Sequence, residues 1–269
     1  MKGILYLIPT PIGNLSDVSP RIINTILSCE KIACEDTRNT AKLLSLLNIS
    51  KPCVACHKFN EISESKVLIE DLNNGKNIGY MSDAGYPCIS DPGFLLAQEA
   101  IKNNIVITPI SGPSAFILAL IASGIECDHF FFYGFLPSKS TERIKILNEL
   151  KTYPITLIFY ESPHRIEKSL NDLYSIFGDR KITIARELTK IHEEYIRTTL
   201  QKITTNYHEI IGEIVLIIEG NKEKEEKINK KEIEDTLNKL VQNGLTKKDA
   251  IKACSIILNL RKNDLYDLI

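Results

Sequence analysis

The sequence predicts an α/β fold of two domains followed by a small helical module, and two patterns predict it. Short apolar runs alternate with amphipathic stretches from residue 4 to residue 123, which is the pattern of βα units around a mostly parallel sheet. Beyond residue 123 the predicted strands outnumber the predicted helices, which favours a separate mixed domain. We therefore expect domains at residues 1–123 and 124–220, and a charged linker with a helical tail at 221–269.

The elements of the first domain follow from local signals. Ser19 precedes Pro20, and apolar residues then recur at helical spacing, so the segment 19–29 is predicted to be a capped helix. The remaining apolar runs and amphipathic stretches of this domain lie at 4–8, 32–34, 39–47, 78–81, 93–102 and 105–107.

In the second domain, strands and helices are predicted from the same periodicities. Strands are expected at 130–135, 155–160, 181–185, 195–200 and 213–219, and helices at 140–151 and 164–177. The run 221–232 is nearly all Lys, Glu and Asn and favours an exposed linker or a solvated helix start. After it, Asn243-Gly244 ends one predicted helix and Thr246 to Asp249 resembles a capping box, so the tail is either a helix-turn-helix or an ordinary packing unit.

The composition argues against a disordered protein and against one that binds nucleic acid or membranes through its overall charge. The chain has 269 residues, 43% of them hydrophobic, which is enough for buried cores. The 33 Lys and Arg balance 34 Asp and Glu, so no large field draws the whole molecule to nucleic acid or membrane. Residues 137–202 hold 12 basic and 9 acidic side chains, an excess that ordinary solvated helix faces explain equally well.

Seven cysteines without regular spacing fit a reducing compartment. The pair Cys53 and Cys56 forms a lone CxxC, which is more typical of a buried strand than of a metal site, and we expect no metal. The first residues lack the pattern of a secretory signal, and no apolar run is long enough for a bilayer. We therefore expect a cytoplasmic protein that does not contact membranes.

Three predicted strands are each followed by a loop stiffened by proline and glycine. These loops lie at 9–14, 82–93 and 108–115. Loops at the carboxyl ends of parallel strands form the crevice in which ligands bind, so the three are predicted to build one pocket. No G-x-x-x-x-G-K-[ST], G-x-G-x-x-G, G-x-S-x-G or H-E-x-x-H motif is present, which disfavours P-loop, dinucleotide-binding, serine hydrolase and zinc protease chemistry.

Ordered motifs along residues 4–220 resemble one known family. The motifs are Thr10-Pro11-Ile12-Gly13-Asn14-Leu15, Glu35-Asp36-Thr37-Arg38, Ser82-Asp83-Ala84-Gly85, Ile89-Ser90-Asp91-Pro92-Gly93, Ser111-Gly112-Pro113-Ser114-Ala115, Gly134-Phe135-Leu136-Pro137, Phe159 to Arg165, Arg186 to Lys190 and Gly212-Glu213. The chain resembles the tetrapyrrole-methylase-fold superfamily of S-adenosylmethionine enzymes, and within it the bacterial enzymes that 2′-O-methylate a cytidine of 16S ribosomal RNA.

This resemblance implies that S-adenosyl-L-methionine binds in a cleft between the two α/β domains. It places Pro11 and Gly13 against the cofactor, and Asp83 with the Ala84-Gly85 turn at the cofactor's polar end. The other implied contacts come from both domains and are Ile89, Ser90, Ser114, Ala115, Leu188 and Glu213. Ser114 and Ala115 stand at a predicted helix start, where backbone N–H groups are free to donate.

A ribose hydroxyl is a poor nucleophile at neutral pH, so the reaction gains from positioning and from a nearby proton acceptor. The candidates for catalysis are Glu35, Asp36, Arg38, His57, Asn60 and Glu61. In the motif at 35–38 one carboxylate could accept the proton while Arg38 binds a phosphate, or the motif could be an acidic first helical turn closed by an ion pair.

The implied substrate is 16S ribosomal RNA or the 30S subunit, and the implied assembly is a homodimer. Basic residues that could line an RNA path, with Phe135 and Tyr160 nearby, are Lys139, Arg143, Arg165, Arg186 and Lys190. Two other functions stay open: a corrin-type small-molecule methylase, and a non-catalytic RNA-binding assembly factor. Binding of the cofactor would separate the last of these from an enzyme.

Overall fold

The computed structural model describes residues 1–222, 230–257 and 265. The chain forms two compact units, one of residues 1–220 and one of residues 221–269, and each is described by itself. No helix among these residues is both long and apolar enough to cross a bilayer.

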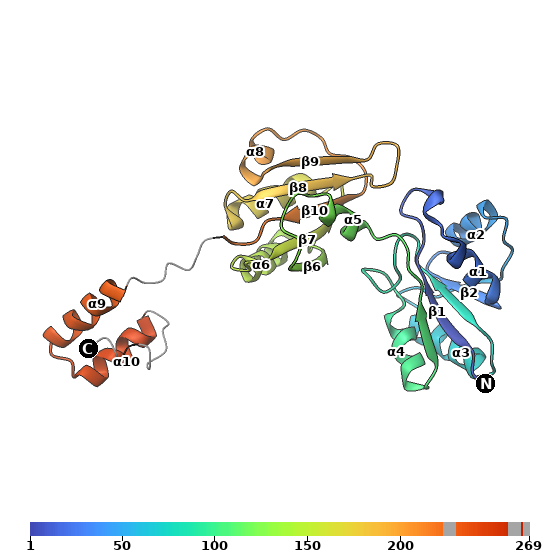
Figure 1. The fold of residues 1–269 in the computed structure, drawn as a ribbon, viewed down its shortest axis with the longest axis horizontal. Helices are drawn as coiled ribbons and strands as arrows, with labels where there is room; N and C mark the ends of the chain where they lie inside the picture. The colour runs from blue at the N-terminus through green and yellow to red at the C-terminus, as the bar shows by residue number, and fades with distance from the viewer. Residues whose placement is uncertain (223–229, 258–264, 266–269) are drawn as a thin grey trace. The chain divides into compact units, whose positions relative to one another are not determined.

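The first half of the larger unit is built on a parallel five-stranded sheet with the strand order β3-β2-β4-β1-β5 (Figure 1). Its strands are β1 (Ile4–Ile8), β2 (Lys31–Cys34), β3 (Cys53–Ala55), β4 (Ile78–Met81) and β5 (Val106–Pro109). The segments between and after them form η1 (Leu15–Asp17), α1 (Pro20–Ser28), α2 (Thr37–Leu46), α3 (Glu61–Asn73), α4 (Phe94–Lys102) and α5 (Ala115–Ile121). The prediction of βα units around a mostly parallel sheet is confirmed.

Helices cover both faces of this sheet. Apolar side chains of α1 and α2, such as Ile22 and Leu44, pack with Ile8 and Met81 on one face. Side chains of α3 and α4 pack with Leu5 and Tyr80 on the other. The predicted cap of α1 is present, because the Ser19 hydroxyl accepts a hydrogen bond from the Ile22 N–H at 3.3 Å. Burial on both faces explains why the inner strands β2 and β4 are almost continuously apolar.

The second half is a mixed five-stranded sheet with the order β6-β7-β10-β8-β9. Its elements are β6 (Phe130–Phe135), α6 (Ser140–Leu150), β7 (Thr156–Glu161), α7 (Ile166–Phe177), β8 (Lys181–Arg186), β9 (Glu194–Thr199), α8 (Leu200–Thr205) and β10 (Ile214–Ile218). Strands β6 and β7 are parallel, whereas β10 is antiparallel to both of its neighbours. Every residue of the central strand β10 is buried, as its run of Ile, Val and Leu requires.

Different elements cover the two faces of this second sheet. One face packs against α6, α7 and α8. The other packs against α5, and Ile12 from the loop after β1 joins the same apolar cluster as Val215. The loop after β1 therefore lies against the second sheet, which brings the two halves of residues 1–220 together.

The smaller unit contains α9 (Lys230–Gln242) and α10 (Lys247–Ile257), which pack through Leu237 and Ile251. Thr246 caps α10 as predicted, because its hydroxyl accepts a hydrogen bond from the Asp249 N–H at 3.2 Å. The Asp249 carboxylate accepts from the Thr246 hydroxyl at 2.6 Å, so the same two residues of the predicted capping box are in contact. Residues 223–229 of the predicted charged linker lie outside the described part of the chain.

Candidate active site

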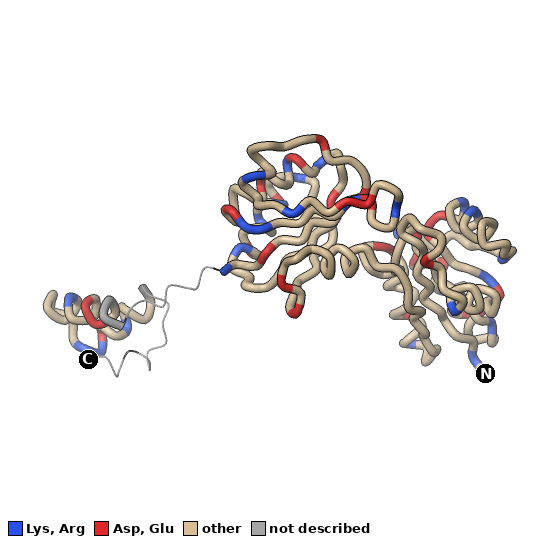
Figure 2. Tube along the Cα trace, turned by 45° about the horizontal axis from the view of Figure 1, so that its top comes forward, with Lys and Arg blue, Asp and Glu red and all other residues tan. Residues whose placement is uncertain are grey.

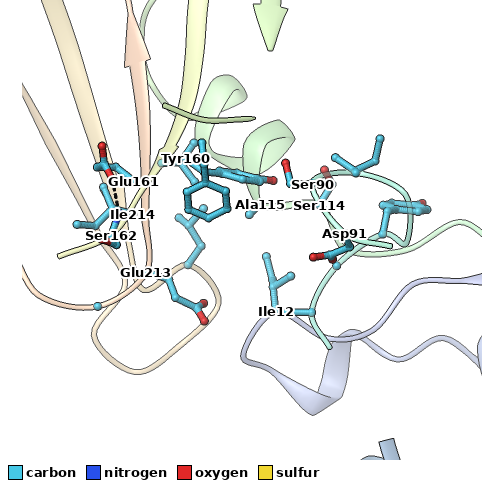
Figure 3. Close-up of a pocket in the computed structure, with 18 of the residues that line it drawn as sticks. Ile12, Ser90, Asp91, Ser114, Ala115, Tyr160, Glu161, Ser162, Glu213 and Ile214 are labelled. Carbon is cyan, nitrogen blue, oxygen red and sulfur yellow. Dashed lines mark hydrogen bonds between the residues drawn. The ribbon is translucent and has the colours of Figure 1, made fainter. Parts of the chain in front are cut away.

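A cavity of about 300 Å³ lies where the loops of the first sheet meet the second sheet (Figure 3). Its volume falls at the lower end of the range for small-molecule sites. The first half contributes Ile12, Ala84, Gly85, Tyr86, Ile89, Ser90, Asp91, Ser114 and Ala115; the second contributes Phe135, Tyr160, Glu161, Ser162, Pro163, Leu188, Gly212, Glu213, Ile214 and Val215. The three predicted loops thus share one pocket with the second half of the unit.

Backbone hydrogen bonds hold the three loops to one another. The N–H of Thr10 donates to the carbonyl of Gly85 at 2.9 Å, and the N–H of Gly85 donates back at 3.0 Å. The Tyr86 hydroxyl accepts a hydrogen bond from the Gly112 N–H at 2.7 Å. Because most of these contacts are made by main chain, they fix the loops with little dependence on side-chain rotamers.

The two halves approach closely at two glycines beside the pocket. A Cβ on Gly134 would lie 2.9 Å from the Ser90 hydroxyl, and a Cβ on Gly13 would lie 2.4 Å from Lys190 Cγ. Ser90 itself has a φ of 64°, a region that non-glycine residues rarely adopt, and so do Cys88, Glu187 and Thr189 in the same loops. Such backbone conformations gather at ligand sites, where the surrounding structure enforces them.

The pocket lining is mainly apolar and aromatic, with three carboxylates, Asp91 from the first half and Glu161 and Glu213 from the second. The rings of Phe135 and Tyr160 lie 5.4 Å apart at a tilted angle. Burial raises the pKa of Tyr160 to about 12, so its hydroxyl is neutral and can donate. Burial, followed by the like charges of Glu35 and Asp83, raises the pKa of Asp91 to about 6.

Eight of the residues assigned to the cofactor by resemblance line this pocket. They are Ala84, Gly85, Ile89, Ser90, Ser114, Ala115, Leu188 and Glu213. The other three, Pro11, Gly13 and Asp83, do not line it. Asp83 is exposed and accepts a hydrogen bond from the Asn39 amide at 2.8 Å.

None of the six residues assigned to catalysis lines the pocket. Asp36 caps α2 by accepting a hydrogen bond from the Arg38 N–H at 2.8 Å, and it pairs with the Arg38 guanidinium at 2.6 Å. Hydrogen bonds from Arg38 lower the pKa of Asp36 to about 2. This geometry is that of a capped helical turn closed by an ion pair, the alternative interpretation of the motif.

Two more of these candidates are engaged in the scaffold. The Asn60 side chain accepts a hydrogen bond from the His57 N–H at 2.7 Å and donates to the Ala55 carbonyl at 3.0 Å. Glu61 is buried, and its Oε1 accepts hydrogen bonds from the N–H groups of Gly93, Leu95 and Leu96. Glu61 therefore holds the start of α4, directly after the pocket loop, and is not placed to act on a substrate in the cavity.

Glu35 follows β2 and is half-buried. Burial and the nearby Asp83 raise its pKa, while the charge of His57 opposes that rise. Its own charge acts on Asp91, so Glu35 influences the pocket through the electrostatic field rather than by contact.

The predicted RNA path is wrong for Arg143. This side chain is buried, and its guanidinium pairs with Asp172 at 2.6 Å. The ion pair connects α6 to α7, so Arg143 is not available to RNA. The other four basic residues also have acidic partners, in the pairs Lys139–Glu142, Arg165–Glu161, Arg186–Glu194 and Lys190–Glu213. Basic and acidic positions are interspersed along residues 1–220 (Figure 2).

Several pocket residues were not predicted as site residues. Asp91 belongs to the motif at 89–93, and its position between Ser90 and Pro92 in that rigid loop is the signal that could have identified it. Glu161 and Ser162 lie at the end of β7 and line the cavity, but nothing in the sequence distinguishes them from residues of an ordinary buried strand end.

Cys53 of the CxxC pair begins the short strand β3. The residues that the structure describes contain no group of three potential metal ligands.

Comparisons with known proteins converge on one family. The family model "Tetrapyrrole (Corrin/Porphyrin) Methylases" matches residues 4–204. "Ribosomal RNA small subunit methyltransferase I" of Halalkalibacterium halodurans is 44% identical over 99% of this chain and 94% of its own length, and the protein of the same name from Escherichia coli O157:H7 is 39% identical over 98% and 94%. Among solved structures, diphthine synthase covers 81% of this chain and 90% of its own at a TM-score of 0.63 and 11% identity, which shows a shared fold.

Proposed function

Because the chain belongs to the tetrapyrrole methylase family, we propose that it transfers a methyl group from S-adenosyl-L-methionine to the ribose 2′-oxygen of a cytidine in 16S ribosomal RNA. The observation that carries the RNA substrate is identity of about 40% along nearly the whole chain with ribosomal RNA methyltransferases of several bacteria. The likeness to solved structures of a uroporphyrin-III-C-methyltransferase and of diphthine synthase is much weaker in sequence and supports the fold alone.

The pocket fits the expected cofactor. Methyltransferases of this family use S-adenosyl-L-methionine. The main chain at Ala84 and the helix start at Ser114 offer polar groups, while Leu188 and Val215 form an apolar wall. Gly85 has a positive φ, and among the described residues only Ile12 Cγ2, at 3.5 Å, lies near the position of a Cβ there, so a ligand can approach this part of the backbone. We propose that these residues hold the cofactor, which supplies an electrophilic methyl group when bound.

The residues of the chain then have two tasks in the reaction. The loops that Thr10, Gly85 and Tyr86 connect keep the pocket preformed, so little ordering is required when ligands bind. The aromatic wall of exposed Phe135 and half-buried Tyr160 shields one side of the cavity from water when ligands are bound. Preformed geometry and exclusion of water both favour direct attack of a positioned hydroxyl.

The proposal is tested by transfer of labelled methyl from S-adenosylmethionine to purified 30S subunits and to naked 16S ribosomal RNA. We expect label in RNA, at one cytidine, on the sugar, as mapped by nuclease digestion and mass spectrometry. Label on a base nitrogen would refute the 2′-oxygen, and transfer to a tetrapyrrole but not to RNA would refute the substrate class.

Assembly and location belong to the same proposal. We propose a homodimer, and exposed apolar side chains near the starts of α3 and α4, Ile62 and Phe94, support an interface there. Light scattering coupled to gel filtration tests it, and a monomer at micromolar concentration would contradict it. Since the proposed substrate is a ribosomal subunit, we further propose that the protein acts in the cytoplasm.

A further inference from the structure

Phe135, the last residue of β6, exposes a large aromatic ring at the edge of the pocket. The residue lines the cavity and is nevertheless 53% exposed, although aromatic side chains are among those that gain most from burial. Its ring meets that of Tyr160 at a tilted angle, with 5.4 Å between the centroids. The two rings do not stack on each other, so a face of the Phe135 ring remains open.

A β-bulge puts this ring on the pocket side of the second sheet. Phe131 packs in the cluster of α6, α7 and α8, and Phe132 packs with Tyr160 on the opposite face. Strict alternation along the strand would give Phe135 the face of Phe131. The register with β7 shifts between Phe132 and Gly134, so Phe135 pairs with Tyr160 and shares its face. Bulges beside sites re-aim side chains in this way.

The backbone and the neighbour that carry the ring are held firmly. Gly134 has a φ of 84°, and a Cβ there would lie 2.9 Å from the Ser90 hydroxyl of the first half. The ring of Tyr160 meets that of Phe132 edge-on at 5.0 Å, and its hydroxyl forms a hydrogen bond with the main chain of Phe116. Little ordering is therefore required when a ligand packs on the open face.

The size of the cavity leaves the target nucleotide at the pocket edge. At about 300 Å³ the cavity lies at the lower end of the range for small-molecule sites, so bound S-adenosylmethionine fills most of it. A ribose that receives the methyl group must then approach from outside, with its base beyond the cavity. Proteins hold unpaired RNA bases largely by stacking them on aromatic side chains.

We propose that the base of the target nucleotide stacks on the open face of Phe135 during methyl transfer. This inference rests on the proposed function. Because the ribose is joined to the base by a single bond, a stacked base also positions the 2′-hydroxyl against the methyl group. A phenyl ring offers no hydrogen bonds, and every base has a π-face, so Phe135 contributes affinity and orientation rather than the choice of base.

The test compares wild type with Phe135→Leu, which stays apolar but cannot stack, and with Phe135→Tyr, which keeps an aromatic face. We expect kcat/KM for 30S subunits to fall about tenfold or more in Phe135→Leu and to stay within about threefold of wild type in Phe135→Tyr. The Kd for S-adenosylmethionine, measured by calorimetry, should stay within about threefold of wild type in both. Phe130→Leu, at another exposed phenylalanine of β6 outside the pocket lining, is the matched control and should equal wild type.

The pattern across these variants separates stacking from other roles. An unchanged kcat/KM in Phe135→Leu, or equal losses in Phe135→Leu and Phe135→Tyr, would overturn stacking. Loss of cofactor affinity by more than about tenfold in Phe135→Leu would assign the ring to the cofactor and overturn it as well. If the wild type binds S-adenosylmethionine but methylates no RNA, the proposed function fails, and the role of Phe135 fails with it.

Discussion

Gly134 in β6 and Ser90 in the loop after β4 touch where the two halves of the larger unit meet. No side chain fits between them, because a Cβ on Gly134 would lie 2.9 Å from Ser90 Oγ. Both residues have positive φ, at 84° and 64°. Ser90 also lines the pocket, so this contact links the packing of the second sheet to the shape of the site.

Gly134→Ala is expected to destabilise the protein by about 2–3 kcal/mol and to weaken S-adenosylmethionine binding about tenfold, since it adds both backbone strain and a clash at the pocket. Gly178→Ala is the matched control: its φ is 71°, but nothing lies within 4 Å of the new Cβ. It should cost about 1 kcal/mol and leave cofactor affinity unchanged. Urea unfolding and calorimetric titration measure both quantities.

Ser90→Ala in the Gly134→Ala background removes the atom that clashes. We expect it to restore part of the lost stability, with a coupling of about 1 kcal/mol in the double-mutant cycle. Strictly additive losses would show that the close approach of these two residues has no energetic weight.

Glu61→Gln is expected to lower stability by about 1–3 kcal/mol, because a buried carboxylate that accepts three backbone hydrogen bonds becomes a weaker, neutral acceptor. Methylation should slow through displacement of the loop that ends at Gly93. Glu70→Gln, at an exposed position of the same helix, should change neither quantity. Equal stabilities of the two variants would remove Glu61 from the support of α4.

Arg38→Ala is expected to spare cofactor binding, because its side chain is 88% exposed and outside the pocket lining. If Arg38 contacts a phosphate, kcat/KM for 30S subunits should fall about tenfold. The slope of log binding constant against log salt concentration should then decrease in magnitude by about one. Arg21→Ala, an exposed arginine of α1, serves as the control. An unchanged salt slope would assign Arg38 to the cap of α2 alone.

Asp91→Asn is expected to stabilise the protein above pH 6 and not below pH 4. The pKa of Asp91 rises from 3.8 to about 6 on folding, so the folded state binds a proton more tightly and loses stability as pH rises through this window. That difference corresponds to about 3 kcal/mol, which solvent screening of a half-exposed group reduces to about 1–2 kcal/mol. Urea titrations of wild type and variant at pH 4 and pH 8 measure it; a gain already complete at pH 4 would contradict it.

Local signals in the sequence predicted much of the fold. The cap at Ser19, the apolar runs of the first sheet and the capping box at Thr246 all depend on residues close in the chain, and each appears where it was expected. The antiparallel pairing of β10 with β7 and β8 was not predictable, because strand order is set by contacts between distant segments.

The site shows the same division between local and distant effects. The loops at 82–93 and 108–115 were recognisable from their prolines and glycines, but Tyr160 and Glu161 face the cavity because of how the second sheet packs. A basic residue looks the same in sequence whether it is free or buried, as Arg143 illustrates. Arg143 is buried because it pairs with Asp172, a residue distant from it in the chain.

The central claim is that the pocket shared by both halves of residues 1–220 holds the methyl donor. Photolysis of protein with 8-azido-S-adenosylmethionine, followed by mass spectrometry of the labelled peptides, tests it directly. We predict label on peptides that contain pocket residues such as Phe135, Tyr160 or Leu188, and protection by unlabelled cofactor. Protectable label confined to residues 221–269, or to surfaces of the larger unit away from these residues, would contradict it.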